Sequence, residues 1–229
     1  MKGWVIPPEE SARFVWRMEE VLDLYEEPYD EKRPVVCLDE RPCQLLADLR
    51  EPLGLRAGRP KRRDHEYERR GMAHLFVAFE PLRGWRGVEV RERRRGREFA
   101  EFVCHLAEDL YPKAEKIRLV VDNLNTHSAA SFYEVFDAER ARELTRRIEF
   151  CYTPVHGSWL NMAEIEISVL AVLVRQCLGG HRIPEAEILR REAWAWCQER
   201  NRLGASVDWR FTTADARTKL RRLYPSIER

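Results

Sequence analysis

Three acidic residues from distant parts of the sequence follow or lie within segments that could bring their carboxylates together in one metal-binding site. Asp39 follows the apolar run VVCL, Asp122 follows IRLVV, and Glu164 lies within YTPVHGSWLNMAEIEIS at 152–168. Such β-branched runs predict buried strands, and open α/β sheets bind ligands at the carboxyl ends of their strands. Carboxylate oxygens suit Mg²⁺ and Mn²⁺. Two acids at strand ends and one on a helix form the set that metal-dependent phosphoryl transfer requires.

Each of these acids also has an ordinary structural explanation. Asp39 and Asp122 could each simply begin a turn, as Asp often does. The helix expected over 160–178 is apolar almost all round, yet at about 100° per residue Glu164 falls on one polar stripe. Its companions on that stripe are Asn161, Ser168 and Arg175. The alternatives to a metal-bearing cleft there are a buried hydrogen-bond network or an ion pair with Arg175.

Glu166 lies about 200° around the same helix, among apolar neighbours. It is expected to face either a subunit interface or solvent, and the sequence does not decide between them. The tryptophans at 194 and 196 are expected to lie partly in the core and partly at the surface.

The charge distribution indicates a polyanionic partner at one face. The net charge of the 229-residue chain is only +1, but basic residues are concentrated in two blocks, 56–70 and 91–97. Local basic blocks in a balanced chain favour contacts with nucleic acid phosphates. Solvated arginine-rich loops are the alternative. The basic residues expected to contact DNA are Arg59, Lys61, Arg62, Arg63, Arg69, Arg70, Arg93, Arg94 and Arg95.

Composition excludes several protein classes. No apolar run approaches the roughly 20 residues that span a bilayer, and the start MKGWVIPPEE is unlike a signal peptide. The six cysteines form no CxxC pair and several lie in apolar runs, which predicts buried thiols in a reducing cytosol. We therefore expect a cytoplasmic protein without a membrane segment.

The order of expected elements is helix, strand, hairpin, helix, strand, helix, strand and further helices. Helical spacing covers 9–26, 97–111, 160–178, 185–201 and 212–223, whereas strands are expected at 35–40, 73–82, 85–93, 116–123 and 148–153. Residues 41–71 look irregular and basic. An antiparallel hairpin beside parallel strands predicts an α/β fold with a ribonuclease-H-like mixed β-sheet flanked by helices.

Three motifs resemble the catalytic signatures of DDE transposases. They are LDE at 38–40, DNLNTH at 122–127 and YTPVHGSWLNMAEIEIS at 152–168. The chain is most similar to the bacterial insertion-sequence branch of the mariner-type superfamily, which WVIPPE at 4–9 and RPVVC at 33–37 also resemble. Glu164 follows Asp122 by 42 positions, which is compatible with that branch.

The resemblance implies specific roles. Asp39, Asp122 and Glu164 match the metal-binding triad, which would hold two Mg²⁺ or Mn²⁺ ions and cut and join DNA. It also implies a ribonuclease-H-like DDE catalytic core acting on double-stranded transposon ends and target DNA as a homodimer or higher assembly near the nucleoid. The supporting positions of the motifs are Asn123, His127, His156, Trp159 and Asn161.

The resemblance also predicts a domain plan. A linker helix at 1–32 leads into the catalytic domain at 33–205, which contains the basic excursion 41–71, and a helical tail follows at 206–229. Full-length relatives place helix-turn-helix modules before this domain, so the chain is expected to lack them. The competing hypotheses are a metal-dependent nuclease without strand transfer and a non-catalytic DNA-binding or assembly remnant.

Overall fold

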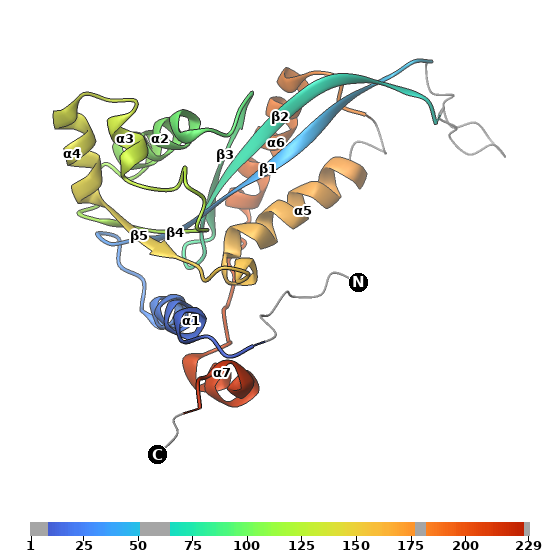
Figure 1. Ribbon diagram of the computed structural model, residues 1–229. Coiled ribbons are helices and arrows are strands. Elements are labelled where there is room, and N and C mark those ends of the chain that lie inside the picture. Colours follow the sequence, from blue (N-terminus) through green and yellow to red (C-terminus); the bar gives the residue numbers. More distant parts are fainter. Residues whose placement is uncertain (1–8, 51–64, 177–181, 227–229) are drawn as a thin grey trace.

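A computed structural model describes residues 9–50, 65–176 and 182–226, in which helices cover both faces of one mixed β-sheet (Figure 1). The sheet has the strand order β3-β2-β1-β4-β5. Its strands are β1 (Val35–Asp48), β2 (Tyr67–Glu80), β3 (Trp85–Arg91), β4 (Ile117–Val121) and β5 (Ile148–Tyr152). β1 pairs antiparallel with β2 and β2 with β3, whereas β1 pairs parallel with β4 and β4 with β5.

One helix precedes the first three strands, helices flank β4 and β5, and the last three helices follow β5. The α-helices are α1 (Ala12–Glu26), α2 (Gly96–His105), α3 (Ala130–Tyr133), α4 (Ala138–Arg147), α5 (Met162–Gln176), α6 (Ala186–Arg202) and α7 (Thr213–Lys219). The π-helix η1 (Leu106–Leu110) continues α2, and the 3₁₀ turns η2 (Ser158–Leu160) and η3 (Arg221–Leu223) precede α5 and follow α7. No helix among the described residues is long and apolar enough to cross a bilayer.

Local sequence signals set several helix boundaries. The Ser11 hydroxyl accepts a hydrogen bond from the Phe14 N–H and caps α1. Asp137 caps α4 in the same way. Thr212 and Asp215 form a reciprocal capping box at the start of α7. Each cap satisfies amide groups that the first helical turn leaves without partners.

Alternation along the strands divides the core into two layers. Val36 and Leu38 face α2, α3 and α4, where Phe99 and Phe102 are fully buried. Val35 and Cys37 point to the opposite face, where α1, the start of α5 and the C-terminal elements pack. A third cluster joins β2 and β3 to α5 and α6. Both faces of the sheet are therefore covered by helices (Figure 1).

The expected excursion at 41–71 is partly wrong. β1 continues to Asp48 and β2 begins at Tyr67, so the two strands form a long hairpin that projects beyond the rest of the sheet (Figure 1). Residues 51–64 lie outside the described part of the chain. Pro42 is tolerated within β1 because the parallel pairing with β4 ends at Cys37, which leaves that side of the strand at an edge.

The remaining element predictions are largely confirmed. The β2–β3 hairpin turns at Gly84, whose positive φ of 67° favours glycine. Of the segment 206–229, expected as a tail, the described residues 206–226 pack against α1 through a cluster that includes Ala216 and Leu223. Of the cysteines, the described five are free thiols; Cys43 and Cys151 are partly exposed rather than buried, and Cys177 lies outside the described residues.

Candidate active site

Asp39 and Asp122 occupy matching places on neighbouring parallel strands. Cys37 of β1 pairs with Val120 of β4, and this is the last parallel pair between the two strands. Each aspartate lies two residues further along, so it shares a face with the paired residue before it. Cys37 and Val120 both lie in the cluster that contains the first turn of α5. The sheet register therefore brings both aspartates to one edge of the sheet, and Asp39 continues the face that packs against α5.

Glu164 enters this edge from the first turn of α5. Asn161 precedes the helix, and its carboxamide oxygen accepts a hydrogen bond of 3.1 Å from the Ala163 N–H. The amide group of the same side chain donates a 2.8 Å hydrogen bond to the carbonyl of Leu38, one residue before Asp39. Asn161 is buried. It therefore fixes the start of α5, and with it Glu164, against β1.

The electrostatics of Asp39 show that the three acids influence one another. Burial raises the pKa of Asp39 to about 7, and the charges of Glu40, Asp122 and Glu164 contribute to the rise. The N–H of Glu40, which donates a 2.8 Å hydrogen bond to Asp39, offsets it only in part. A carboxylate held among other carboxylates in a half-buried site favours a bound cation.

His127 bridges two acids at this edge. Its Nδ1 lies 2.6 Å from Asp122 and its Nε2 lies 2.8 Å from Glu40, while its ring packs 4.7 Å from that of Phe99. Burial opposes protonation of the imidazole, but the hydrogen bonds to the two acids outweigh it and raise the pKa of His127 to about 9. This raised pKa favours the cationic form of the ring at neutral pH. In turn, although burial of Asp122 acts to raise its pKa, the contact with His127 lowers it overall.

Glu40 was missed by the sequence analysis. Consecutive residues of a strand point to opposite faces, so Glu40 faces away from Asp39 and toward the layer that holds His127. The sequence signal for this residue is the pair Asp39-Glu40 at the end of an apolar strand. Because the two side chains point to opposite faces, Glu40 is buried on the other face, and a buried acid requires a cationic partner.

The other predicted supporting residues have different environments. Asn123 donates a side-chain hydrogen bond to the carbonyl of Thr153 and so ties the ends of β4 and β5 together. His156 is exposed in the loop after β5 and has a positive φ of 65°. Trp159 is buried and stacks with Trp209 at 6.5 Å between ring centres. The structure thus places Trp159 in the core behind the site rather than in it.

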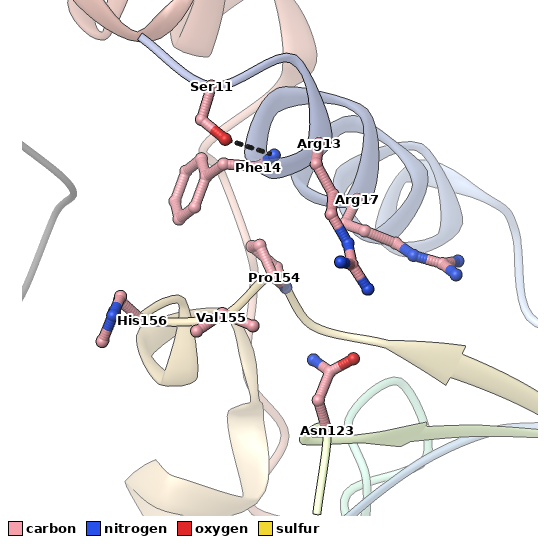
Figure 2. Close-up of a pocket in the computed structure, with 8 residues that line it drawn as sticks. All are labelled: Ser11, Arg13, Phe14, Arg17, Asn123, Pro154, Val155 and His156. Atoms are coloured by element: carbon pink, nitrogen blue, oxygen red, sulfur yellow. Dashed lines mark hydrogen bonds between the residues drawn. The ribbon is translucent and has the colours of Figure 1, made fainter. Parts of the chain in front are cut away.

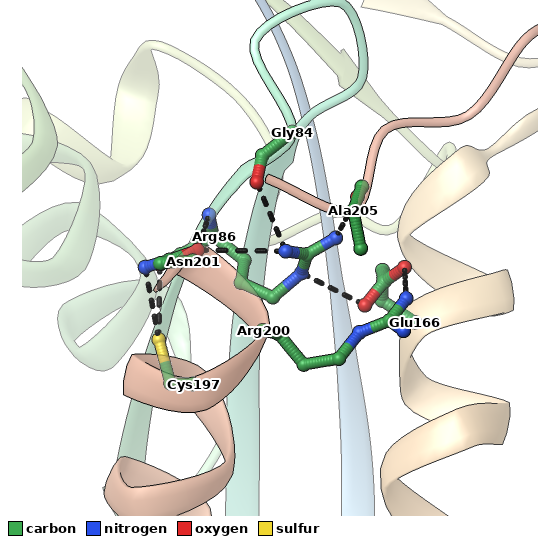
Figure 3. Close-up of polar contacts among 7 residues, drawn as sticks. All are labelled: Gly84, Arg86, Glu166, Cys197, Arg200, Asn201 and Ala205. Atoms are coloured by element: carbon green, nitrogen blue, oxygen red, sulfur yellow. Dashed lines mark hydrogen bonds and ion pairs between the residues drawn. The ribbon is translucent and has the colours of Figure 1, made fainter. Parts of the chain in front are cut away.

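Glu166 is buried in an internal ion-pair cluster, which answers the question that the sequence left open (Figure 3). Its carboxylate lies 2.8 Å from Nε of Arg86 and 2.9 Å from the guanidinium of Arg200. Arg86 is fully buried and also donates hydrogen bonds to the carbonyls of Gly84 and Ala205. The cluster joins α5 to β3 and α6, so Glu166 faces neither a subunit interface nor solvent.

The predicted DNA-contacting residues are only partly described. Arg59, Lys61, Arg62 and Arg63 lie outside the described residues. Arg69 and Arg70 are exposed on the projecting part of β2, where Arg70 pairs with Glu68. Arg93, Arg94 and Arg95 are exposed between β3 and α2, and the charge of Arg94 contributes to the lowered pKa of Asp122. Arg94 therefore lies near the carboxylate edge.

The donor set fits a hard divalent cation by chemistry. Asp39, Asp122 and Glu164 offer only oxygen ligands. The described contacts of Asp122 with His127 and with the Leu124 N–H both involve Oδ1, so Oδ2 can face a cation. Among the described residues, no group of three His, Cys, Asp or Glu side chains is drawn together tightly enough to hold a metal.

Comparison with known families agrees with this arrangement. The sequence profile described as "DDE superfamily endonuclease" matches residues 34–190, which include all three acids. This chain belongs to the DDE superfamily of endonucleases. A comparison with curated protein sequences finds no match.

Solved structures similar to this DDE domain share its fold. The Mos1 mariner paired end complex with Mn matches with a TM-score of 0.58 at 15% identity, covering 89% of this chain and 61% of the other. The Mos1 paired-end complex with the left transposon end gives 0.56 at 17% identity over the same shares. The Mos1 strand transfer complex gives 0.57 at 14% identity, with 89% and 60% covered.

These likenesses confirm the expected ribonuclease-H-like fold. The mixed five-stranded sheet with helices on both faces is the architecture that the DDE domain shares with the Mos1 structures. The chain spans about three fifths of the length of those proteins.

Proposed function

We propose that this DDE domain is the catalytic part of a mariner-type transposase of the bacterial insertion-sequence branch. It would cut DNA at transposon ends and join those ends to target DNA. The observation that carries the proposal is the shared edge of the sheet, to which β1, β4 and α5 each bring one carboxylate. Family membership and the fold shared with Mos1 transposase complexes support it.

The residues for metal binding follow from the donor set. Asp39, Asp122 and Glu164 would hold two Mg²⁺ or Mn²⁺ ions, and one of the similar Mos1 complexes contains Mn. When bound, such ions activate the attacking oxygen and stabilise the leaving oxygen of an in-line displacement at phosphorus. The chain therefore needs no nucleophilic side chain of its own.

The chain's own groups orient that displacement. His127, held between Glu40 and Asp122, fixes the rotamer of Asp122 and keeps one positive charge beside the acids. Asn161 fixes the position of Glu164. Exposed Arg94, close enough to influence Asp122, is placed to bind a DNA phosphate.

The partners and the location of the protein form part of the same proposal. The Mos1 neighbours are complexes with paired transposon ends, and by analogy the DDE domain would act on two double-stranded ends as a dimer or higher assembly. It would work in the bacterial cytoplasm, at the nucleoid.

The test is cleavage of labelled duplex DNA in Mg²⁺ or Mn²⁺ at low salt, which favours weak phosphate contacts. Wild-type protein is compared with Glu164→Gln and with the matched control Glu187→Gln, which changes an exposed first-turn glutamate of α6. We expect nicking by the wild type and the control but not by Glu164→Gln.

Strand joining separates the proposal from its alternatives. Oligonucleotides with a free 3′-hydroxyl end are supplied with a supercoiled target. Metal-dependent joining supports a transposase, whereas nicking without joining supports a nuclease. Absence of both activities, with equal thermal stability with and without Mn²⁺, would mean a non-catalytic remnant.

A further inference from the structure

A cavity of about 180 Å³ lies beside the carboxylate edge, between α1 and the loop that follows β5 (Figure 2). Arg13, Phe14 and Arg17 line it from α1, and Asn123 and Pro154 line it from the sheet side. None of its eight lining residues is acidic. The cavity is thus separate from the three acids, although Asn123 directly follows Asp122 in the chain.

The two arginines give this cavity its charge. Arg13 and Arg17 are four residues apart on α1, a spacing that places them on the same side of the helix. Arg13 is exposed and forms no ion pair within the described residues. Arg17 pairs with Glu20 at 2.9 Å and lies 5.9 Å from the ring of Tyr152 at the end of β5. Figure 2 shows both side chains extending from α1 on the side of Asn123.

An apolar wall accompanies the charge. Phe14, Pro154 and Val155 line the same space, and Val155 is 57% exposed. The arrangement of guanidinium groups beside apolar carbon suits a sugar and its phosphate better than a free inorganic anion, because the sugar covers apolar surface while the phosphate meets the arginines.

The loop that lines one side of the cavity has an unusual backbone conformation. His156 adopts a left-handed φ of 65°, and the Gly157 N–H donates a 2.8 Å hydrogen bond to the carbonyl of Pro154 to close the turn. A non-glycine residue in this region costs on the order of 1 kcal/mol, and such strain gathers at ligand-binding sites.

We propose that this cavity binds one backbone phosphate and its deoxyribose next to the scissile phosphodiester, with Arg13 and Arg17 contacting the phosphate. The inference rests on the proposed function, since it takes DNA as the substrate. Asn123, which lines the cavity, directly follows Asp122, so the cavity adjoins the carboxylate edge.

The test combines arginine variants with single-phosphate neutralisation. Arg13→Gln/Arg17→Gln is compared with Arg142→Gln/Arg146→Gln, which changes two exposed arginines of the same spacing on α4, the helix that leads into the opposite end of β5. Equilibrium DNA binding is measured without metal over a range of salt, on duplexes that carry one neutral methylphosphonate at successive positions near the cut.

We expect the α1 double variant to bind about tenfold more weakly and to reduce the salt slope by about 1, whereas the α4 variant behaves as wild type. One methylphosphonate position should weaken the wild type and leave the α1 variant unaffected. Equal binding by both double variants, or an interference pattern that the α1 variant retains, would overturn the proposal.

The same binding measurements separate this proposal from the catalytic one. If the wild-type protein never cuts DNA but the α1 double variant binds DNA more weakly than the wild type, the cavity proposal is supported and the proposed catalytic activity is excluded. If the α1 double variant cuts and binds DNA as the wild type does, only the cavity proposal is excluded. A wild-type protein that binds no duplex at low salt overturns both.

Discussion

The side-chain amide of Asn161 donates a hydrogen bond to the carbonyl of Leu38, the residue that precedes Asp39. The same side chain caps α5 through the Ala163 N–H. One buried carboxamide thus sets the distance between the strand that carries one candidate metal ligand and the helix that carries another.

Replacement of Asn161 tests this coupling. Asn161→Ala removes both hydrogen bonds and should lower the unfolding free energy by about 1–3 kcal/mol. Asn161→Asp keeps the cap but turns an acceptor toward the Leu38 carbonyl, so it should reduce Mn²⁺ affinity more than Asn161→Ala does. Urea unfolding and calorimetry with Mn²⁺ give the two quantities. Unchanged Mn²⁺ affinity in both variants would contradict a positioning role.

Asp39→Asn should stabilise the metal-free protein. The pKa of Asp39 is raised above its ordinary value, to about 7, so keeping the ionised carboxylate buried among other acids costs free energy above that pH. At pH 8 the variant should gain roughly 1–3 kcal/mol in chelator. Added Mn²⁺ should raise the melting temperature of the wild type and not of the variant. Thermal melts at pH 5 and pH 8 check the sign, because the gain should shrink at the lower pH.

The Arg86–Glu166 pair can be tested by a double-mutant cycle. Glu166→Leu leaves a fully buried guanidinium without its carboxylate and should cost about 3–5 kcal/mol. Arg86→Met/Glu166→Leu removes both charges and should recover much of that loss, since an apolar pair replaces an ionic one. Unfolding in urea measures each corner of the cycle. A double variant as unstable as the two single losses added together would exclude coupling between them.

Gly157→Ala should distort the turn after β5. A Cβ atom at this position would lie 2.5 Å from Cγ of Pro154, a ring atom that cannot rotate away. We expect a loss of about 1–3 kcal/mol in stability, together with weaker DNA binding. Gly204→Ala is the control for adding a methyl group, since nothing lies near its Cβ position, although its φ of 57° adds strain. Equal DNA binding by the two variants would show that the turn does not shape the cavity.

The docking of α7 on α1 should weaken in acid. The bidentate contact with Arg217 lowers the pKa of Glu19 below its ordinary value, and Tyr224 donates a further hydrogen bond to the carboxylate. A lowered folded-state pKa means that this contribution is present above the ordinary value of 4.5 and is lost as the pH falls through the folded value. Limited proteolysis of the C-terminal segment between pH 3 and pH 6 should therefore accelerate at low pH. Glu19→Gln should already be cut faster at pH 6.

The sequence predicted what depends on local patterns and missed what depends on distant partners. The β-branched runs before Asp39 and Asp122 identified two neighbouring strands, and apolar residues at helical spacing identified most helices. The extension of β1 to Asp48 was missed because cross-strand pairing with β2, rather than its own alternation, holds that polar segment extended. Arg86 lies 80 positions before Glu166 in the sequence, so no local sequence pattern could predict that the two residues form an ion pair.

The parallel pairing of β1 with β4 has a consequence for the order of folding. Residues at 37 and 120 must meet across the intervening chain, and such long-range closure is slow compared with the formation of hairpins and helices. The carboxylate edge then needs α5, which comes later still along the sequence. During synthesis, a chain that ends before α5 lacks Glu164 and so lacks the complete set of acids. Any capacity to damage DNA therefore arises only after this long-range closure is complete.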